Sequence, residues 1–274
     1  MLRTRRYPRR GAHGETVYEI GRRIVSGELQ PGDLLPEGEL IVELDISRTV
    51  LREAIKVLGA KGLVEARPRI GTKVSPRSHW RLMDPDVLAW QTEYGFDELF
   101  LRNLAEVRSF IEPGAARLAA ERATEEEIAI LDKAYKQMEA HVVNSEAFIA
   151  ADMQFHFIIL AACHNEILEQ MSSAIGEALE ISRRVTVELP GSSEAHLPLH
   201  EAVVEAIRTR DADAAEIAMG ELIGFVQSDV ERFLQRNELE AKLDDGDPGA
   251  AAGTTALRLI QGTRPAAEQR KNSL

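Results

Sequence analysis

The helical period of residues 97–236 constrains the fold of this chain more than any other feature of its sequence. Apolar residues recur there every three to four positions, which places them on one face of an α-helix. Capping and turn-forming residues interrupt the period at 123–124, near 144–145, at 164–165, at 190–193 and at 210–211. We therefore expect an all-helical domain of six or seven helices with no strand.

Residues 16–74 show a different order of elements. Apolar positions with helical spacing predict three helices, over 16–26, 37–44 and 47–61. Two short strands then flank a turn that contains Pro68 and Gly71. Three helices followed by a β-hairpin are typical of a winged helix-turn-helix. The predicted fold class is mainly α, with an N-terminal winged helix-turn-helix and an all-α helical bundle.

The length of 274 residues suits one small domain and one larger domain. We expect a winged helix-turn-helix over 13–77 and the helical domain over 98–236, joined by a connector over 78–97 that docks on the helical domain. Residues 1–12 contain five Arg without an apolar period, and residues 237–274 are rich in Ala, Gly and Thr. Both segments are expected to be disordered.

Targeting signals and cysteine usage limit the location of the chain. No apolar run approaches the roughly 18 to 20 residues that cross a bilayer, and no apolar stretch follows the basic N-terminus. Cys163 is the only cysteine, so neither an intramolecular disulfide nor a multi-cysteine metal site is expected. We expect a cytoplasmic protein with no membrane partner. Cys163 next to His164 is better explained as a core cysteine than as a nucleophile.

The net charge of −12 is distributed unevenly. Residues 1–78 contain 15 Lys and Arg against 10 Asp and Glu, whereas residues 79–240 contain 13 against 31. Local positive charge sets the affinity for a polyanion, because each neutralised phosphate releases condensed counterions. The N-terminal part is therefore suited to bind DNA although the chain as a whole is acidic.

The third predicted helix of the N-terminal domain has the composition of a DNA-recognition helix. Ser47 is expected to cap its N-terminus, and Arg48, Arg52 and Lys56 share one face because they recur every four residues. Thr49 lies beside Arg48 in the first turn. Arg binds the O6 and N7 atoms of guanine with two hydrogen bonds, and Thr contacts phosphate or a thymine methyl group.

The predicted hairpin adds further basic residues. Arg69 is expected near its tip, with Arg67 and Lys73 close by, where it would contact the adjoining DNA backbone or minor groove. A charged helix face exposed only to solvent is the alternative interpretation. The combination of basic arm, capped basic helix and basic hairpin favours DNA binding.

Asp152, His156 and His200 are candidate metal ligands in the helical domain. Asp152 and His156 project together from a mainly apolar helix, because four residues separate them. His200 begins another amphipathic helix. The alternatives are a surface Asp–His ion pair and a helix cap. A metal hydrolase built on these three residues is a rival function, although the sequence offers no clear general base.

The N-terminal domain resembles that of GntR-type winged-helix regulators. The matching motifs are IVSG at 24–27, PGD at 31–33, LP at 35–36, SRTVLREA at 47–54 and KGLVE at 61–65. The resemblance implies that Arg48, Thr49 and Arg52 contact operator bases and phosphates. Relatives usually carry Ser-Glu-Arg-Glu-Leu after Leu-Pro, whereas this chain has the shorter EGEL at 37–40. The arginine of that run, and with it any base contact that it makes in relatives, is missing from these positions.

Residues 98–235 resemble the FCD effector domain of the FadR-like branch of GntR regulators. The matching motifs are EVR at 106–108, EP at 112–113, LAA at 118–120, DMQFH at 152–156, Asn165, His200, AI at 206–207 and DADAA at 211–215. The resemblance implies a divalent metal, zinc or nickel, that Asp152, His156 and His200 bind together with a carboxylate effector. The fourth ligand position falls on Leu222, which cannot bind metal, and Glu221 would reach the metal only in a rotated helix.

The same resemblance assigns the effector-binding residues. Arg108 corresponds to an arginine that pairs with the effector carboxylate, with a salt bridge to a neighbouring Glu as the alternative, and Asn165 belongs to the same set. Residues 80–90 further resemble repressors of galactonate and related sugar-acid catabolism. The implied function is that of a homodimeric repressor. It would bind operator DNA and respond to an aldonate such as galactonate. Another small carboxylate, or a sensor that does not bind DNA, remains the alternative.

Overall fold

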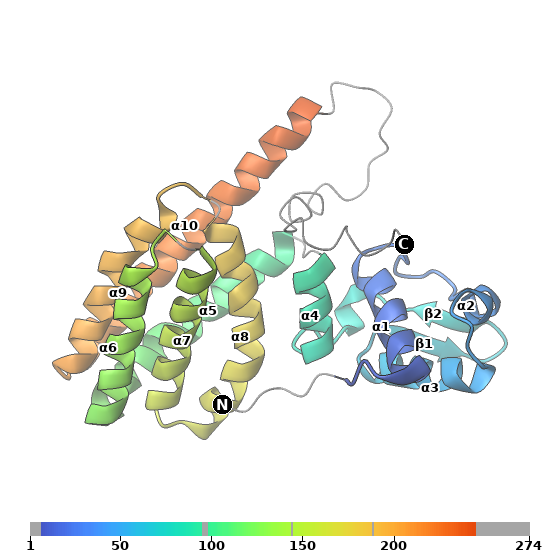
Figure 1. Cartoon of the computed structure of the whole chain (residues 1–274), viewed down its shortest axis with the longest axis horizontal. Coiled ribbons are helices and arrows are strands. Elements are labelled where there is room, and N and C mark those ends of the chain that lie inside the picture. Colours follow the sequence, from blue (N-terminus) through green and yellow to red (C-terminus); the bar gives the residue numbers. More distant parts are fainter. Residues whose placement is uncertain (1–6, 95–97, 144, 188, 245–274) are drawn as a thin grey trace, which may run out of the picture.

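The computed structural model describes residues 7–94, 98–143, 145–187 and 189–244 (Figure 1). Helix α4, Pro85–Tyr94, lies between two units of the described chain. Helices α1 to α3 and a β-hairpin form one unit, and helices α5 to α10 form the other. The predicted fold class, a winged helix-turn-helix joined to an all-helical bundle, is confirmed.

The N-terminal unit has the predicted order of elements. Its members are α1 Gly11–Val25, α2 Glu37–Glu43, α3 Arg48–Ala60, β1 Val64–Arg67 and β2 Gly71–Val74. The two strands pair antiparallel with Val64 opposite Val74, and Leu34 forms an isolated bridge with Lys73. The buried core consists of apolar side chains that recur with helical spacing, among them Ile20, Leu51 and Leu58.

The first helix begins earlier than the apolar period indicates. It starts at Gly11, so the predicted disordered arm over 1–12 is wrong for its C-terminal part. The backbone N–H of Tyr7 donates to Asp86 Oδ1 at 2.9 Å, and the Tyr7 hydroxyl lies 3.0 Å from His13 Nδ1. These contacts hold residues 7–10 against α1 and α4, whereas residues 1–6 lie outside the described part.

The connector contacts both units and not the helical domain alone. Trp80, Val87 and Trp90 are buried in the core of the N-terminal unit. Leu88 is buried instead in a cluster with Val185 of the helical domain. The expectation that the connector docks on the helical domain therefore describes only one of its two faces.

Six helices form the C-terminal unit of the described chain. They are α5 Glu98–Arg122, α6 Glu125–Ala140, α7 Ser145–Ala162, α8 Glu166–Thr186, α9 Ser192–Arg208 and α10 Ala212–Asp244. Each predicted break separates two of these helices. Thr124 and Glu127 form a capping box at the start of α6, which satisfies two free N–H groups there. Residues 237–244 continue α10, so the predicted disordered tail begins too early; residues 245–274 lie outside the described part.

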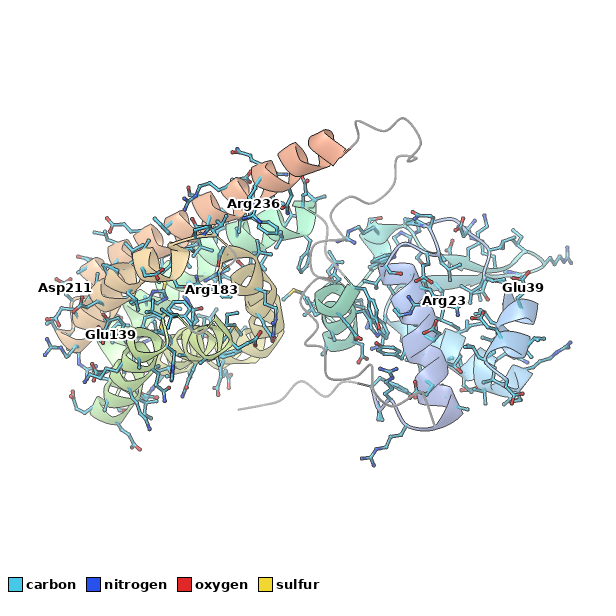
Figure 2. The ribbon with its side chains drawn as sticks, turned by 45° about the horizontal axis from the view of Figure 1, so that its top comes forward. Arg23, Glu39, Glu139, Arg183, Asp211 and Arg236 are labelled. Carbon is cyan, nitrogen blue, oxygen red and sulfur yellow. The ribbon has the colours of Figure 1, made fainter. Side chains whose placement is uncertain are left out.

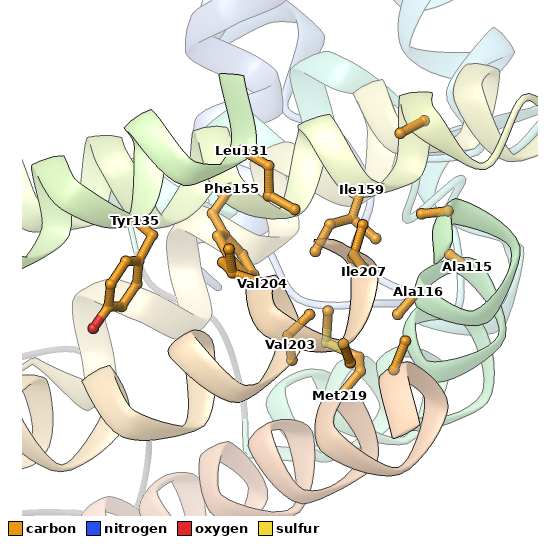
Figure 3. Close-up of a cluster of buried hydrophobic side chains, with 14 of the residues drawn as sticks. Ala115, Ala116, Leu131, Tyr135, Phe155, Ile159, Val203, Val204, Ile207 and Met219 are labelled. Atoms are coloured by element: carbon orange, nitrogen blue, oxygen red, sulfur yellow. The ribbon is translucent and has the colours of Figure 1, made fainter. Parts of the chain in front are cut away.

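The core of the C-terminal unit combines small and large side chains (Figure 3). Ala115 and Ala116 of α5 share this core with the larger Phe155 and Ile159 of α7, and the two helices pack against each other. Burial of a side chain the size of Phe155 stabilises the fold by roughly 1.5–3 kcal/mol. Cys163 is also buried, and its Sγ donates to the carbonyl of Leu160 at 2.9 Å. Among the described residues, no helix is both long and apolar enough to cross a membrane.

Candidate functional site

The outer face of α3 carries the residues predicted to contact DNA. Ser47 caps the helix, because its side chain accepts a hydrogen bond from Val50 N at 3.2 Å. Leu51, Ala54 and Leu58 bury the inner face in the core. The opposite face is exposed to solvent and carries four predicted residues: Arg48, Thr49, Arg52 and Lys56.

The basic residues of this face differ in their partners. Neither Arg48 nor Arg52 has an ion-pair partner among the described residues. Lys56 Nζ lies 2.6 Å from Glu53 Oε1, and both side chains are exposed. The two arginines are therefore the free cations of this face, whereas the charge of Lys56 is partly balanced.

The hairpin presents Arg69 at its tip. Arg69 is exposed and has φ of 65°, a left-handed conformation that fits the tight turn between β1 and β2. Arg67 lies 2.6 Å from Glu65 within β1, so its charge has a local partner. The structure thus places Arg69 at the position expected for the wing of a winged helix-turn-helix.

A second cluster of functional groups lies inside the helical domain. Asp152 and His156 come from α7, His200 from α9, Arg108 and Glu112 from α5, and Arg183 from α8. None of these six side chains is more than 2% exposed. Four helices therefore direct ionisable groups toward one point in an otherwise apolar core, and Figure 2 marks Arg183 within this unit.

The three predicted metal ligands lie together. One donor atom from each of Asp152, His156 and His200 lies within 4.8 Å of the other two. His200 Nε2 is 3.0 Å from Asp152 Oδ1, and His156 Nε2 is 3.8 Å from Asp152 Oδ2. Burial alone would raise the pKa of Asp152, but the positive charge of Arg183 outweighs it and holds this pKa well below its usual value.

The hydrogen bonds of His200 determine which of its nitrogens is free. His200 Nδ1 lies 2.8 Å from the carbonyl oxygen of His196, which only accepts, so Nδ1 carries the proton. Burial lowers the pKa of His200, which favours the neutral ring. The lone pair of His200 Nε2 then points toward Asp152 Oδ1, and neither of these two acceptor atoms carries a hydrogen. A cation between these atoms would satisfy both, so the donor set fits a divalent metal.

Arg108 extends the cluster toward α5. Its Nε lies 2.6 Å from Glu112 Oε1, as the salt-bridge alternative predicted, and Glu112 Oε2 lies 2.6 Å from His156 Nδ1. Burial opposes ionisation of Glu112, but the positive charge of Arg108 and the hydrogen bond from His156 Nδ1 outweigh it and lower its pKa to about 2. Nη1 and Nη2 of Arg108 are buried without a hydrogen-bond partner in the described part of the protein. These nitrogens are available to an anionic ligand.

A neighbouring polar group was not found by sequence reasoning. Ser192 Oγ donates to Asp229 Oδ2 at 2.6 Å, and His196 Nε2 lies 3.6 Å from the same oxygen. All three residues are buried. His196 stands one helical turn before His200, so their spacing is a signal that was available.

Glu112 and Arg183 were also missed, for different reasons. Glu112 stands four residues after Arg108, which is the spacing of a helical ion pair. No such signal identifies Arg183. Its buried neighbours Ser182 and Thr186 are polar, so the pattern of apolar residues does not show that this face of α8 is buried. The adjacent Arg184 is part-exposed and pairs with Glu146 and Glu180.

Two predicted site positions have other roles in the structure. Asn165 is the N-cap of α8 and accepts hydrogen bonds from Ile167 N and Leu168 N. It precedes Arg183 by 18 residues, roughly 27 Å along the helix, so it lies away from the buried cluster that contains Arg108. Leu222 is fully buried in the apolar core, and Glu221 is exposed on α10. Neither contributes a fourth ligand.

Comparison with known proteins agrees with this architecture. The model of the gntR family of bacterial regulatory proteins matches residues 14–74, and the FCD domain model matches residues 103–225. The galactonate operon transcriptional repressor of Escherichia coli (strain K12) is 39% identical over 207 residues, covering 74% of this chain and 89% of the relative. The Uxu operon transcriptional regulator of the same strain is 29% identical over 233 residues, covering 81% and 87%.

A solved structure supports the fold. The structure of Lar, which controls expression of the Listeria monocytogenes agr system, aligns with a TM-score of 0.59 at 17% identity. The alignment covers 83% of this chain and 99% of Lar. The matching families and relatives are transcriptional regulators, so the prediction of a regulator rather than an enzyme is confirmed. The chain belongs to the gntR family of bacterial regulatory proteins and carries an FCD domain.

Proposed function

We propose that this chain is a ligand-responsive repressor that binds operator DNA through the exposed face of α3. The observation that carries the proposal is that Arg48 and Arg52 are exposed without acidic partners in the described chain, beside Thr49 on a capped helix. Such guanidinium groups are available for guanine edges and phosphates. We assign weaker backbone contacts to Lys56 and to Arg69 of the wing. Operator DNA lies in the cytoplasm, which agrees with the expected location.

An electrophoretic titration tests this assignment. A preferred duplex is first selected with the full-length protein from a pool of random sequences. Arg48→Ala and Arg52→Ala should each weaken binding to it by about 1–3 kcal/mol. Arg208→Ala is the matched control, because Arg208 is an exposed arginine that pairs with Glu205 on α9. Failure to select any duplex would refute the DNA-binding function, and unchanged affinity of both variants would refute the roles of these two residues.

We further infer that the effector is a sugar acid, with an aldonate such as galactonate as the first candidate. Arg108 supports this inference, because its two buried nitrogens without partners, Nη1 and Nη2, can donate to the two oxygens of a carboxylate. One relative is the galactonate operon transcriptional repressor of Escherichia coli, and galactonate is a sugar acid. Ligand binding would relieve repression by favouring one placement of the DNA-binding units over another.

Calorimetry with galactonate, gluconate, galacturonate and lactate tests the effector class. We expect heat with at least one sugar acid and its loss in Arg108→Gln. Binding of lactate alone would favour a regulator of another small carboxylate, and absence of heat with every sugar acid would refute the inference.

We propose that a divalent metal of the zinc or nickel type binds to Asp152, His156 and His200. The convergence of three donors and the free lone pair of His200 support this proposal. A bound metal would supply positive charge for the effector carboxylate. Titration with zinc against a chelating dye should show one site per chain, and Asp152→Asn should remove it.

We propose that two copies of the chain form a homodimer, because a palindromic operator has two symmetric half-sites and each binds one DNA-binding unit. Leu99, Val107 and Phe110 lie on one face of α5 and are exposed, Phe110 at 84%. Ile217 is exposed on α10, which packs along α5. Phe110→Glu should halve the mass measured by light scattering, whereas Ile167→Glu on α8 should leave it unchanged. Wild-type protein that is monomeric at every concentration would refute the dimer.

A further inference from the structure

A buried arginine lies directly on the donor atoms of the proposed metal site. Arg183 extends from α8 and is 1% exposed. Its Nε lies 2.5 Å from Asp152 Oδ2, and its Nη2 lies 3.1 Å from His156 Nε2. Asp152 and His156 are two of the three residues whose donor atoms converge. The guanidinium group therefore holds two of the three ligands that a metal would use.

The hydrogen-bonding chemistry makes this overlap exclusive at His156. A guanidinium group has donors and no acceptor, so His156 Nε2 must accept from Arg183. The proton of the ring is then on Nδ1, which lies 2.6 Å from Glu112 Oε2. A metal ion binds a histidine through the same unprotonated nitrogen. One lone pair cannot serve Arg183 and a metal at the same time.

The charges of the cluster are already balanced without a metal. Arg108 and Arg183 provide two positive charges, and Glu112 and Asp152 provide two negative charges, all of them buried. A divalent ion would place two more positive charges next to Arg183, and the apolar Leu222 offers no donor in compensation. Excess buried charge without a partner is strongly unfavourable. A metal that enters this site therefore favours departure of the guanidinium group from Asp152.

We propose that Arg183 is the resident cation of this site and competes directly with a divalent metal for Asp152 and His156. The metal binds only molecules in which Arg183 has left these two donors, so the apparent affinity is reduced by the population of that state. The inference rests on the proposed metal site and adds the residue that sets its affinity. Arg184 has no part in it, because its guanidinium group contacts Glu146 and Glu180 on the surface.

A cobalt(II) titration of the full-length protein tests the competition. Cobalt(II) replaces zinc in such sites, and its ligand-field absorption reports coordination by nitrogen and oxygen. Arg183→Gln should bind cobalt about tenfold or more tightly than wild type. Arg184→Gln, the matched control on the same helix, should bind as wild type does. Asp152→Asn combined with Arg183→Gln should abolish the absorption.

Thermal unfolding keeps the test decisive if Arg183→Gln is unstable. Removal of Arg183 leaves Asp152 buried without its cation, so the metal-free variant should melt below wild type, and cobalt should raise its melting temperature more than that of wild type. Equal or weaker cobalt binding by a folded Arg183→Gln would overturn the competition while leaving a wild-type metal site intact. Absence of cobalt binding in both proteins would overturn the competition and the proposed metal site together.

Discussion

Glu112 joins two groups of the buried cluster, although it is not one of the predicted ligands. It contacts Arg108 through one oxygen and His156 through the other, each at 2.6 Å. Removal of one partner from a buried ion pair leaves the other charge uncompensated. The stability of the helical domain therefore depends on Glu112, a residue that the sequence analysis did not include among the site residues.

Substitution of Glu112 should test this dependence. Glu112→Gln should lower the free energy of unfolding by about 3–5 kcal/mol, because Arg108 loses its buried counter-charge. Urea denaturation followed by circular dichroism measures the change. Glu121→Gln, on the exposed part of the same helix, should change it by less than about 1 kcal/mol. Similar losses in both variants would contradict a special role of the buried pair.

His196 should make the stability of the protein depend on pH. Burial, followed by the positive charge of Arg183, lowers the pKa of His196 from 6.5 to about 2. Below pH 6.5 the unfolded chain therefore binds a proton that the folded chain does not, so stability falls as the pH decreases. Between pH 6.5 and 4.5 the loss attributable to His196 should be about 2–3 kcal/mol. Urea unfolding of His196→Gln should show a flatter pH profile over this range, whereas that of His141→Gln, an exposed histidine, should match wild type.

At the scale of elements, helix ends were predictable where the chain carries its own capping signals. Ser47 and Thr124 both accept hydrogen bonds from the first turns of their helices, as their sequence positions indicate. Helix α1 begins before its apolar period because contacts of Tyr7 with Asp86, 79 residues away, hold its start. Helix α4 begins with Pro85, a residue favoured at the first helical position, although the sequence predicted only a connector there.

The candidate site was predictable only in part, because the sequence does not show which helices pack against one another. The spacing of Asp152 and His156 predicts that they project together, and the structure brings His200 to them. Spacing along one helix does not indicate which other helices face it. Arg183 therefore went unnoticed, although it lies closer to Asp152 than either histidine does.

The contact of α1 with α4 provides a prediction at this scale. A Cβ atom on Gly21 would lie 2.3 Å from the ring of Trp90, which is 3% exposed. Gly21→Ala should therefore destabilise the N-terminal unit by about 1–3 kcal/mol through overpacking and should change the fluorescence of Trp90. Gly38→Ala in α2 meets no atom within 4 Å and should be neutral or slightly stabilising. Thermal unfolding monitored by tryptophan fluorescence distinguishes the two outcomes.

At the scale of the whole molecule, α4 is the physical link between the two proposed functions. Its Leu88 is buried against a cluster that contains Val185, two residues beyond Arg183 on α8. Its Val87 and Trp90 are buried in the core of the DNA-binding unit. A displacement of α8 that accompanies occupation of the polar cluster would therefore act on α4, and through it on α1 and the placement of α3.

Two neighbouring substitutions in α4 should separate ligand binding from the DNA response. Leu88→Ala removes the contact with the α8 cluster, whereas Val87→Ala removes a contact with the DNA-binding unit, and both side chains are fully buried. A ligand that couples to DNA typically changes operator affinity by about 5–150-fold. For Leu88→Ala, the ratio of the operator affinity without galactonate to that with galactonate should be close to one. Calorimetry should still detect binding of galactonate to this variant. Val87→Ala should lower stability and reduce the ratio less than Leu88→Ala does, because Trp90 of α4 remains buried in the DNA-binding unit. Equal ratios in wild type and Leu88→Ala would show that the two units communicate by another route.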